Sequence, residues 1–342
     1  MPYQVTIQPS GHSFAVNEDE TILAAALREG YALPYGCRNG ACGSCKGKLL
    51  EGRVDYGAYQ ETALKPEEKA VGKVLFCVGK ACSDLVIEAR EISAAKDIAA
   101  KTLPCRVQYM ESRADDVMVL KLKLPANERL QFLAGQYLDF LLKDGRRRSY
   151  SIANPPHADE LIELHLRHVP GGLFTDHVFS AMKEKEILRI NGPLGSFFIR
   201  EDSDKPMIFV AGGTGFGPIK AMLEHLFEEK SPRRMVLYWG ARSLKDLYMA
   251  ELPARWRQQH DNFDFIPVLS EPKSDDAWGG RTGFVHQAVL EDIEDFSGCQ
   301  VYACGAPAMV DSARDAFTRR GLPAEEFFAD SFVYAADAAP QS

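Results

Sequence analysis

Residues 35–45 read Tyr-Gly-Cys-Arg-Asn-Gly-Ala-Cys-Gly-Ser-Cys, and a fourth cysteine of the same group follows at position 77. Two bridged irons need four thiolates that converge on one place, and a turning, glycine-rich loop can supply three of them. This spacing predicts a [2Fe–2S] cluster ligated by Cys37, Cys42, Cys45 and Cys77. A structural zinc ion is the alternative, but zinc sites favour paired C-x2-C hooks, and this loop has one.

The residues around this loop, 1–92, have the pattern of a small strand-rich unit with one helix. Alternation at Tyr3–Ile7 and Ser13–Val16 predicts a hairpin, and the apolar run Thr21–Arg28 predicts a helix. A hydrophobic patch at 73–77 and an alternating strand at 84–89 complete the unit. With its cysteine spacing, this stretch resembles the plant-type ferredoxins. The resemblance implies an α+β domain with the β-grasp fold.

A linker is expected at residues 93–101, which are small, polar and rich in alanine, with no periodic apolar face. In residues 102–200, short strand-like segments alternate with glycine and proline turns, and one helix is expected at 173–182. This rhythm predicts a small antiparallel β-barrel. The expected strands are 105–110, 117–124, 137–142, 161–167 and 187–190.

Residues 201–335 follow a different rhythm, in which buried strands alternate with helices. This alternation predicts an α/β domain, with helices on both faces of a parallel sheet. The expected strands are 207–211, 235–239, 264–268 and 300–303, and the expected helices are 218–229, 252–259, 285–290 and 308–320. Residues 336–342 are expected to form a flexible tail.

Two motifs in the barrel segment suit a flavin nucleotide. Arg148-Ser-Tyr-Ser151 offers a planar guanidinium for a diphosphate, and Tyr150 offers a flat ring with a hydroxyl for a ring system. Further on, Gly171-Gly172 leads into a helix whose free N–H groups form an anion site, and Thr175 adds a hydroxyl.

A third motif, Ala211-Gly-Gly-Thr-Gly-Phe-Gly-Pro218, comes directly after a buried strand and directly before a helix. Glycines let the backbone close on a diphosphate at a helix N-terminus. The motif is neither G-x-G-x-x-G nor a Walker A loop. A tight turn without a ligand is the alternative.

These three motifs, in this order, resemble the ferredoxin-NADP reductase superfamily. The resemblance implies that Arg148 and the backbone of Gly172–Thr175 hold the FAD pyrophosphate, while Tyr150 and Ser151 contact the isoalloxazine. The residues expected to bind cofactors are Arg148, Ser149, Tyr150, Ser151, His165, Arg167, Gly172, Leu173 and Thr175 in the barrel, and Gly212, Gly213, Thr214, Gly215, Arg242, Cys304 and Gly305 in the nicotinamide domain.

Structural roles are the alternative for some of these residues. His165 and Arg167 also fit an ordinary barrel surface, and Arg242 also fits a solvated charge.

The resemblance also implies a catalytic group of Ser151, Cys304 and Phe332. Phe332 is expected to cover the flavin face that the nicotinamide later occupies, with Tyr334 next in line. The alternatives are that Phe332 fills the core and that Cys304 is a buried core thiol.

Nearly the whole chain resembles the NADH-dependent ferredoxin-flavin reductase components of bacterial multicomponent oxygenases, and it is also similar to CDP-6-deoxy-glucoseen reductase. This implies electron flow from NADH through FAD and the [2Fe–2S] cluster to a terminal oxygenase, or another acceptor, that docks near the cluster loop. A free-standing flavin reductase or diaphorase is the alternative among enzymes, and a redox sensor is the alternative from another class.

Composition excludes several other classes of function. The net charge of −8 argues against a nucleic-acid partner. No apolar run approaches the roughly 18 residues of a membrane span, and no secretory signal is recognised, so we expect a cytoplasmic protein.

Arg242 and Lys245 are the only nearby cations after Trp239, which favours NADH over NADPH.

Overall fold

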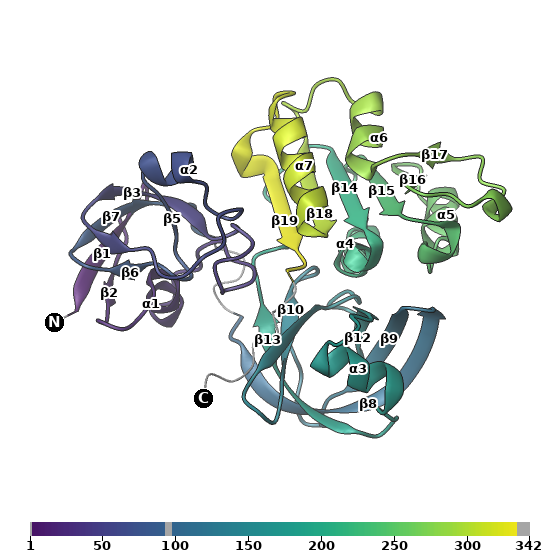
Figure 1. Cartoon of the computed structure of the whole chain (residues 1–342), viewed down its shortest axis with the longest axis horizontal. Helices are drawn as coiled ribbons and strands as arrows, with labels where there is room; N and C mark the ends of the chain where they lie inside the picture. The colour runs from purple at the N-terminus through teal and green to yellow at the C-terminus, as the bar shows by residue number, and fades with distance from the viewer. Residues whose placement is uncertain (1, 93–97, 334–342) are drawn as a thin grey trace. The chain divides into compact units, whose positions relative to one another are not determined.

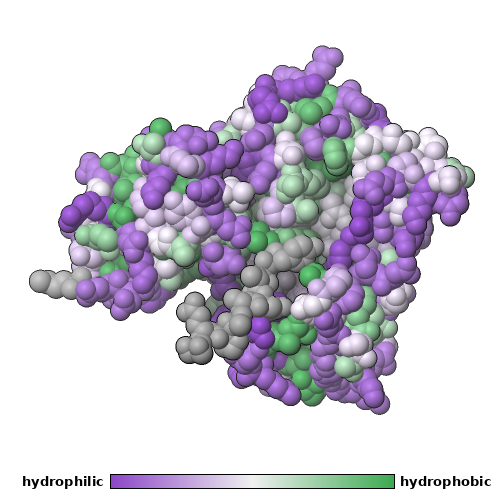
Figure 2. Space-filling view, viewed as in Figure 1, coloured by the Kyte–Doolittle hydropathy of each residue, from purple (hydrophilic) through white to green (hydrophobic). Residues whose placement is uncertain are grey.

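The computed structural model describes residues 2–92 and 98–333. The chain forms two compact units (Figure 1): one contains the residues up to Ala99 together with Gly195–Phe197, and the other contains Ala100–Leu194 and the residues from Phe198 onward. In the view of Figure 2, hydrophilic side chains cover much of the surface. No helix of the described residues is long and apolar enough to cross a membrane.

The first unit is built on a five-stranded sheet in the order β2-β1-β7-β3-β5. Its hairpin and its first helix are confirmed, and the Thr21 hydroxyl caps that helix by accepting a hydrogen bond from the Ala24 N–H at 3.2 Å. A short second helix was not expected. The elements are β1 (Tyr3–Gln8), β2 (Ser13–Val16), α1 (Ile22–Arg28), β3 (Lys46–Glu51), β4 (Val54–Asp55), α2 (Pro66–Ala70), β5 (Lys73–Leu75), β6 (Lys80–Ala81) and β7 (Leu85–Glu88).

The second unit begins with a six-stranded antiparallel sheet in the order β11-β10-β13-β8-β9-β12, which confirms the predicted barrel-like flavin domain. Its first strand is longer than expected: it begins at Lys101 and continues to Ala114, with register shifts in its pairing with β9. The elements are β8 (Lys101–Ala114), β9 (Val117–Lys123), β10 (Tyr137–Leu141), β11 (Arg147–Ser151), β12 (Ile162–Arg167), α3 (Leu173–Ser180) and β13 (Ile187–Leu194).

The rest of this unit is the predicted parallel sheet, in the order β17-β16-β15-β14-β18-β19. One face packs against α6 and α7, and an aromatic cluster lies between α4 and α5. The edge strand β17 was not expected. The elements are β14 (Met207–Gly212), α4 (Phe216–Glu228), β15 (Met235–Ala241), α5 (Glu251–Gln259), β16 (Phe263–Leu269), β17 (Arg281–Thr282), α6 (Val285–Asp292), β18 (Gln300–Gly305), α7 (Pro307–Thr318) and β19 (Phe327–Ser331).

The strand order reverses beside β14. The chain runs from β14 outward to β15, β16 and β17, and then returns to the other side of β14 as β18. Ligands of open parallel sheets bind at the carboxyl ends of the strands at such a reversal. The glycine turn that follows β14 lies at this point, and the Trp239 indole N–H holds it by donating to the Gly213 carbonyl at 3.0 Å.

The turn packs so closely on β18 that residue 215 has no room for a side chain. A Cβ on Gly215 would lie 2.1 Å from the Cys304 carbonyl oxygen, which is backbone and cannot rotate away. A glycine is therefore required here for packing, although its backbone is ordinary helical backbone, with φ of −58°.

We predict that Gly215→Ala destabilises the second unit by about 1–3 kcal/mol, because the turn must move away from β18. Gly298→Ala is the matched control, since no atom lies within 4 Å of its Cβ position. Calorimetric melting of the two variants measures the difference. Equal melting temperatures would show that the turn yields without cost.

Candidate functional site

The four predicted ligand cysteines lie together in the first unit, but as two pairs. Cys42 has the strongest influence on the pKa of Cys37, and Cys77 has the strongest influence on the pKa of Cys45. Among the residues that the structure describes, no group of three or more histidine, cysteine or acidic side chains is arranged to hold a single metal ion. A zinc site needs such a group, whereas a [2Fe–2S] cluster takes two thiolates on each iron. The paired arrangement therefore fits the two-iron cluster.

Backbone N–H groups of the loop donate hydrogen bonds to two of these sulfurs. The Ala41 N–H donates to Cys37 Sγ at 3.4 Å, and the Cys37 N–H donates to Cys42 Sγ at 3.3 Å. The hydrogen bond from Cys42, together with backbone N–H groups, lowers the pKa of Cys37 to about 6.

Glycines keep the loop close to the sulfurs. A Cβ on Gly36 would lie 3.1 Å from Cys42 Sγ, and Gly40 has φ of +75° with the Ala58 carbonyl oxygen 2.9 Å from its Cβ position.

In the second unit, the Arg148–Ser151 motif forms most of β11. The Tyr150 ring packs against Phe140 and Phe174, with centroids 5.8 Å and 5.6 Å away, and burial raises the pKa of its hydroxyl. Arg148 Nη1 donates to the Arg147 carbonyl at 2.9 Å. Ser149 is exposed, but its hydroxyl donates to the buried Asp139 at 2.6 Å.

The glycine pair before α3 forms a closed loop. The Thr175 hydroxyl donates to the Val169 carbonyl at 3.0 Å, and a Cβ on Gly172 would lie 2.7 Å from that hydroxyl. Thr175 therefore holds the shape of the loop, while Leu173 at the start of the helix is exposed. The backbone N–H groups of this helix start remain the part of the motif that suits an anion.

Ser151 meets the end of the parallel sheet. Its hydroxyl donates to Asp330 Oδ2 at 3.0 Å, and Asp330 pairs with Cys304 in the register of β19 and β18. Burial raises the pKa of the Cys304 thiol, and the Asp330 charge acts in the same direction. The Phe332 N–H donates to the Gly305 carbonyl at 2.8 Å, so the backbone of Phe332 lies beside the residue that follows Cys304. Tyr334 lies outside the described residues.

Asp330 was missed by the sequence analysis. It stands in a hydrophobic strand with no motif around it, and only the strand pairing brings it to Ser151.

His165 lies inside a buried polar cluster. One ring nitrogen is 2.8 Å from the Tyr248 hydroxyl, and the other is 3.0 Å from Glu163 Oε1. Glu163 also pairs with Lys220 of α4 at 3.1 Å, and Lys220 donates to the Ala153 carbonyl at 3.0 Å. With its side chain only 1% exposed and both nitrogens engaged, His165 ties β12 to the parallel-sheet domain.

The charges of this cluster follow from its burial. Burial lowers the pKa of His165 below its usual value of 6.5, although Glu163 opposes that shift. Burial alone would raise the pKa of Glu163, but His165 and Lys220 outweigh it and hold that pKa well below its usual range.

Arg167 points to the glycine turn. Its Nη2 lies 3.1 Å from the Cβ position of Gly213, and its Nε lies 3.6 Å from Asp116 Oδ2. In the part of the chain that the structure describes, Nε and Nη2 are buried without a hydrogen-bond partner. Gly213 has φ of +53°, which favours glycine. Unused donors beside a glycine turn fit an anionic group such as a diphosphate.

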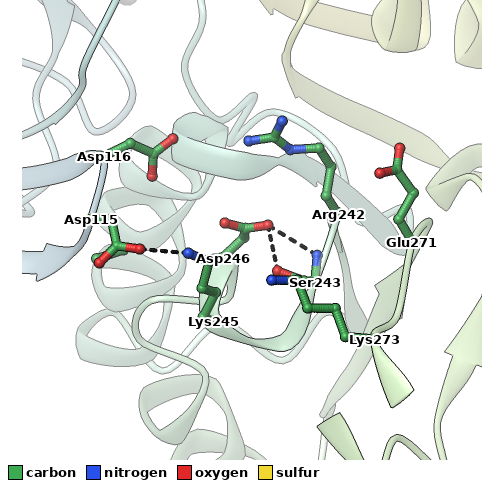
Figure 3. Close-up of a pocket in the computed structure, with 9 residues that line it drawn as sticks. Asp115, Asp116, Arg242, Ser243, Lys245, Asp246, Glu271 and Lys273 are labelled. Atoms are coloured by element: carbon green, nitrogen blue, oxygen red, sulfur yellow. Dashed lines mark hydrogen bonds and ion pairs between the residues drawn. The ribbon is translucent and has the colours of Figure 1, made fainter. Parts of the chain in front are cut away.

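A cavity of about 350 Å³ opens at the carboxyl end of β15 (Figure 3). Arg242 and Lys245 lie there as the sequence suggested, but Lys273 and the four acidic residues were not foreseen. The Ser243 N–H and hydroxyl both donate to Asp246 Oδ2, at 3.0 Å and 2.9 Å. The lining residues are Ala114, Asp115, Asp116, Arg242, Ser243, Lys245, Asp246, Glu271 and Lys273.

Three protein-family models match the chain in sequence order. They are the 2Fe-2S iron-sulfur cluster binding domain over residues 5–82, the oxidoreductase FAD-binding domain over residues 104–199 and the oxidoreductase NAD-binding domain over residues 209–315. These matches confirm the predicted order of domains and the three predicted cofactors.

Relatives and solved structures align over nearly the whole chain. The CDP-6-deoxy-L-threo-D-glycero-4-hexulose-3-dehydrase reductase of Yersinia pestis is 43% identical over 97% of this chain and 99% of its own. Reductase component 2 of the terephthalate 1,2-dioxygenase of Comamonas sp. is 38% identical over 97% of this chain and 98% of its own. The crystal structure of the Amycolatopsis cytochrome P450 reductase GcoB has a TM-score of 0.77 at 32% identity, covering 96% of this chain and 98% of that one.

The buried histidine generates a prediction about pH. The pKa of His165 in the folded protein lies below 6.5, its usual value. As the pH falls through 6.5, the unfolded chain therefore takes up a proton before the folded protein does, and the folded protein loses stability. One such proton changes the free energy of unfolding by up to about 1.4 kcal/mol per pH unit. We expect the flavin-release melting temperature to fall more steeply between about pH 7 and 5.5 in the native protein than in His165→Gln.

The surface variant His12→Gln is the control for this experiment, and it should keep the native slope. Parallel slopes in the native protein and His165→Gln would contradict the assignment of a neutral, buried His165.

Proposed function

The chain belongs to the family of iron–sulfur flavoprotein reductases that join a [2Fe–2S] domain, an FAD-binding domain and an NAD-binding domain, and we propose that it passes electrons from NADH to a partner oxygenase. The observation that carries this proposal is the pairing of the four cluster cysteines in a chain that also has both nucleotide-binding domains. NADH releases two electrons as a hydride and a [2Fe–2S] cluster takes one at a time, so FAD, which does both, connects them.

The FAD is held, in this proposal, between β11 and α3. Arg148 and the N–H groups of Gly172–Thr175 bind its diphosphate, and Tyr150 and Ser151 contact the ring system. The packing of Tyr150 on two phenylalanine rings supports this role, because it fixes the plane of the phenol ring. The roles of Ser149 and Thr175 are indirect, since their hydroxyls bond to Asp139 and Val169.

The dinucleotide binds at the glycine turn. The N–H groups of Gly212–Gly215 and the unused donors of Arg167 bind its diphosphate. We therefore assign Arg167 to the dinucleotide and His165 to the interior of the protein.

Ser151 and Cys304 would lie beside the reacting rings of the flavin and the nicotinamide, which would supply the hydride-transfer chemistry. Asp330 orients the Ser151 hydroxyl by accepting its hydrogen bond. Cys304 is fully buried and neutral, so it shapes the nicotinamide pocket by its size. Phe332 covers the flavin face until the nicotinamide displaces it.

The acceptor docks near the cluster loop, because the electrons leave the protein from the cluster. A cytoplasmic location is part of the same proposal, since NADH is the proposed donor and cluster ligation requires reduced cysteines.

We predict that Cys77→Ser lowers NADH-dependent reduction of cytochrome c by more than about tenfold, while reduction of ferricyanide, which FAD serves directly, stays within about twofold. Cys82→Ser, which removes an exposed thiol of the same domain, should leave both activities unchanged. Iron, labile sulfide and FAD content are measured on each variant. Equal loss of both activities in a folded, FAD-replete Cys77→Ser protein would contradict the proposed order of electron flow.

A CDP-6-deoxyhexulose dehydrase is the second candidate acceptor. It is favoured by the identity of 43% to the reductase of that dehydrase, compared with 38% to the terephthalate dioxygenase component. Anaerobic mixing of the NADH-reduced protein with purified acceptors of both classes tests the choice, and we expect reoxidation of the cluster by an oxygenase. Reoxidation by the dehydrase alone would replace the oxygenase with the second candidate.

A further inference from the structure

The cavity at the end of β15 gathers charged side chains from both domains of the second unit. Four are acidic and three are basic, so the cavity has no excess of positive charge. Asp115 and Asp116 come from the turn between β8 and β9, in the flavin domain, and the other charged residues come from the loops after β15 and β16. Figure 3 shows Asp115 and Lys245 facing each other across this junction.

The cavity is placed to receive the adenosine ribose of the dinucleotide, an assignment that rests on the proposed function. β14 and β15 pair in parallel, with Gly212 opposite Gly240, so the diphosphate turn and the cavity lie at neighbouring strand ends. In dinucleotide-binding sheets, a side chain just after the second strand contacts the 2′-hydroxyl of the adenosine ribose, or the 2′-phosphate where there is one.

The cations of the cavity differ in how far they are available. In the described ranges, the Arg242 guanidinium has no hydrogen bond or ion pair, and it faces the cavity (Figure 3). Lys245 Nζ is instead bonded to Asp115 Oδ2. The hydrogen bond and charge of Lys245, and to a smaller extent the charge of Lys273, lower the pKa of Asp115.

A 2′-phosphate carries nearly two negative charges and needs a guanidinium with further cationic support. Arg242 can supply the guanidinium, but Asp115 competes for the supporting lysine and adds a negative charge of its own. The Ser243 hydroxyl is also committed, because it donates to Asp246. An unphosphorylated ribose brings no charge and avoids this competition.

We propose that Asp115, contributed by the flavin domain, is a specificity-determining residue that favours NADH over NADPH by keeping Lys245 from a 2′-phosphate. Both side chains are largely exposed, so the effect is modest and is screened by salt.

The test compares two probes that differ only in the 2′-phosphate: 5′-AMP and adenosine 2′,5′-bisphosphate. Calorimetric titration of the holoprotein gives the ratio of their affinities. Asp115→Asn should shift this ratio toward the bisphosphate by about two- to fivefold, and the ratio of kcat/KM for NADPH to that for NADH should rise in parallel. The shift should shrink when the salt concentration is raised to about 0.5 M.

Two further variants make the result specific to the pair. Asp261→Asn removes an exposed carboxylate of the parallel-sheet domain that does not line the cavity, and it should not change the ratio. Asp115→Asn combined with Lys245→Gln should return the ratio to its native value.

An unchanged ratio in Asp115→Asn, an equal shift in Asp261→Asn, or a shift that survives removal of Lys245 would each overturn the proposal. Weak binding of both probes to a protein that still oxidises NADH would overturn the cavity assignment while the proposed function stands.

Discussion

The buried ion pair between Glu163 and Lys220 fixes the second unit, because it joins a strand of the flavin domain to the first helix of the parallel-sheet domain. Both side chains are largely shielded from water, with 12% of Glu163 and 8% of Lys220 exposed, and removing one partner of a buried pair typically costs about 3–5 kcal/mol. Each charge has further partners: Glu163 also contacts His165 and Lys121, and Lys220 also contacts Glu224 and the Ala153 carbonyl. The pair thus favours one relative position of the two domains, since a shift would break a salt bridge in a place that is largely shielded from water.

The contacts that we propose to be functional in this unit depend on the relative position of the two domains, because each one crosses between them. Ser151 on the barrel bonds to Asp330 on the sheet, and Arg167 on the barrel lies beside the glycine turn. Asp115 on a barrel turn bonds to Lys245 beside the cavity. Neither domain alone contains a complete site.

Local sequence signals predicted the parts of the molecule that are local in space. The cysteine loop, the glycine turn and the alternation of strands and helices could all be found, because each requires particular residues close together in the chain. Asp330, Asp115 and the Glu163–Lys220 pair could not, since their partners lie far away in sequence and no spacing rule connects them. His165 illustrates the same limit: its strand was predicted, but what its ring contacts depends on the other domain.

The position of β19 has a consequence for how the protein is made. Among the described elements, this edge strand is the last to leave the ribosome, and it joins a sheet whose other five strands have already been synthesised. The carboxylate that bonds to Ser151 arrives only with it. A nascent chain can therefore fold the barrel and most of the sheet before Ser151 has its partner, and translation that stops short of β19 yields a protein without this contact.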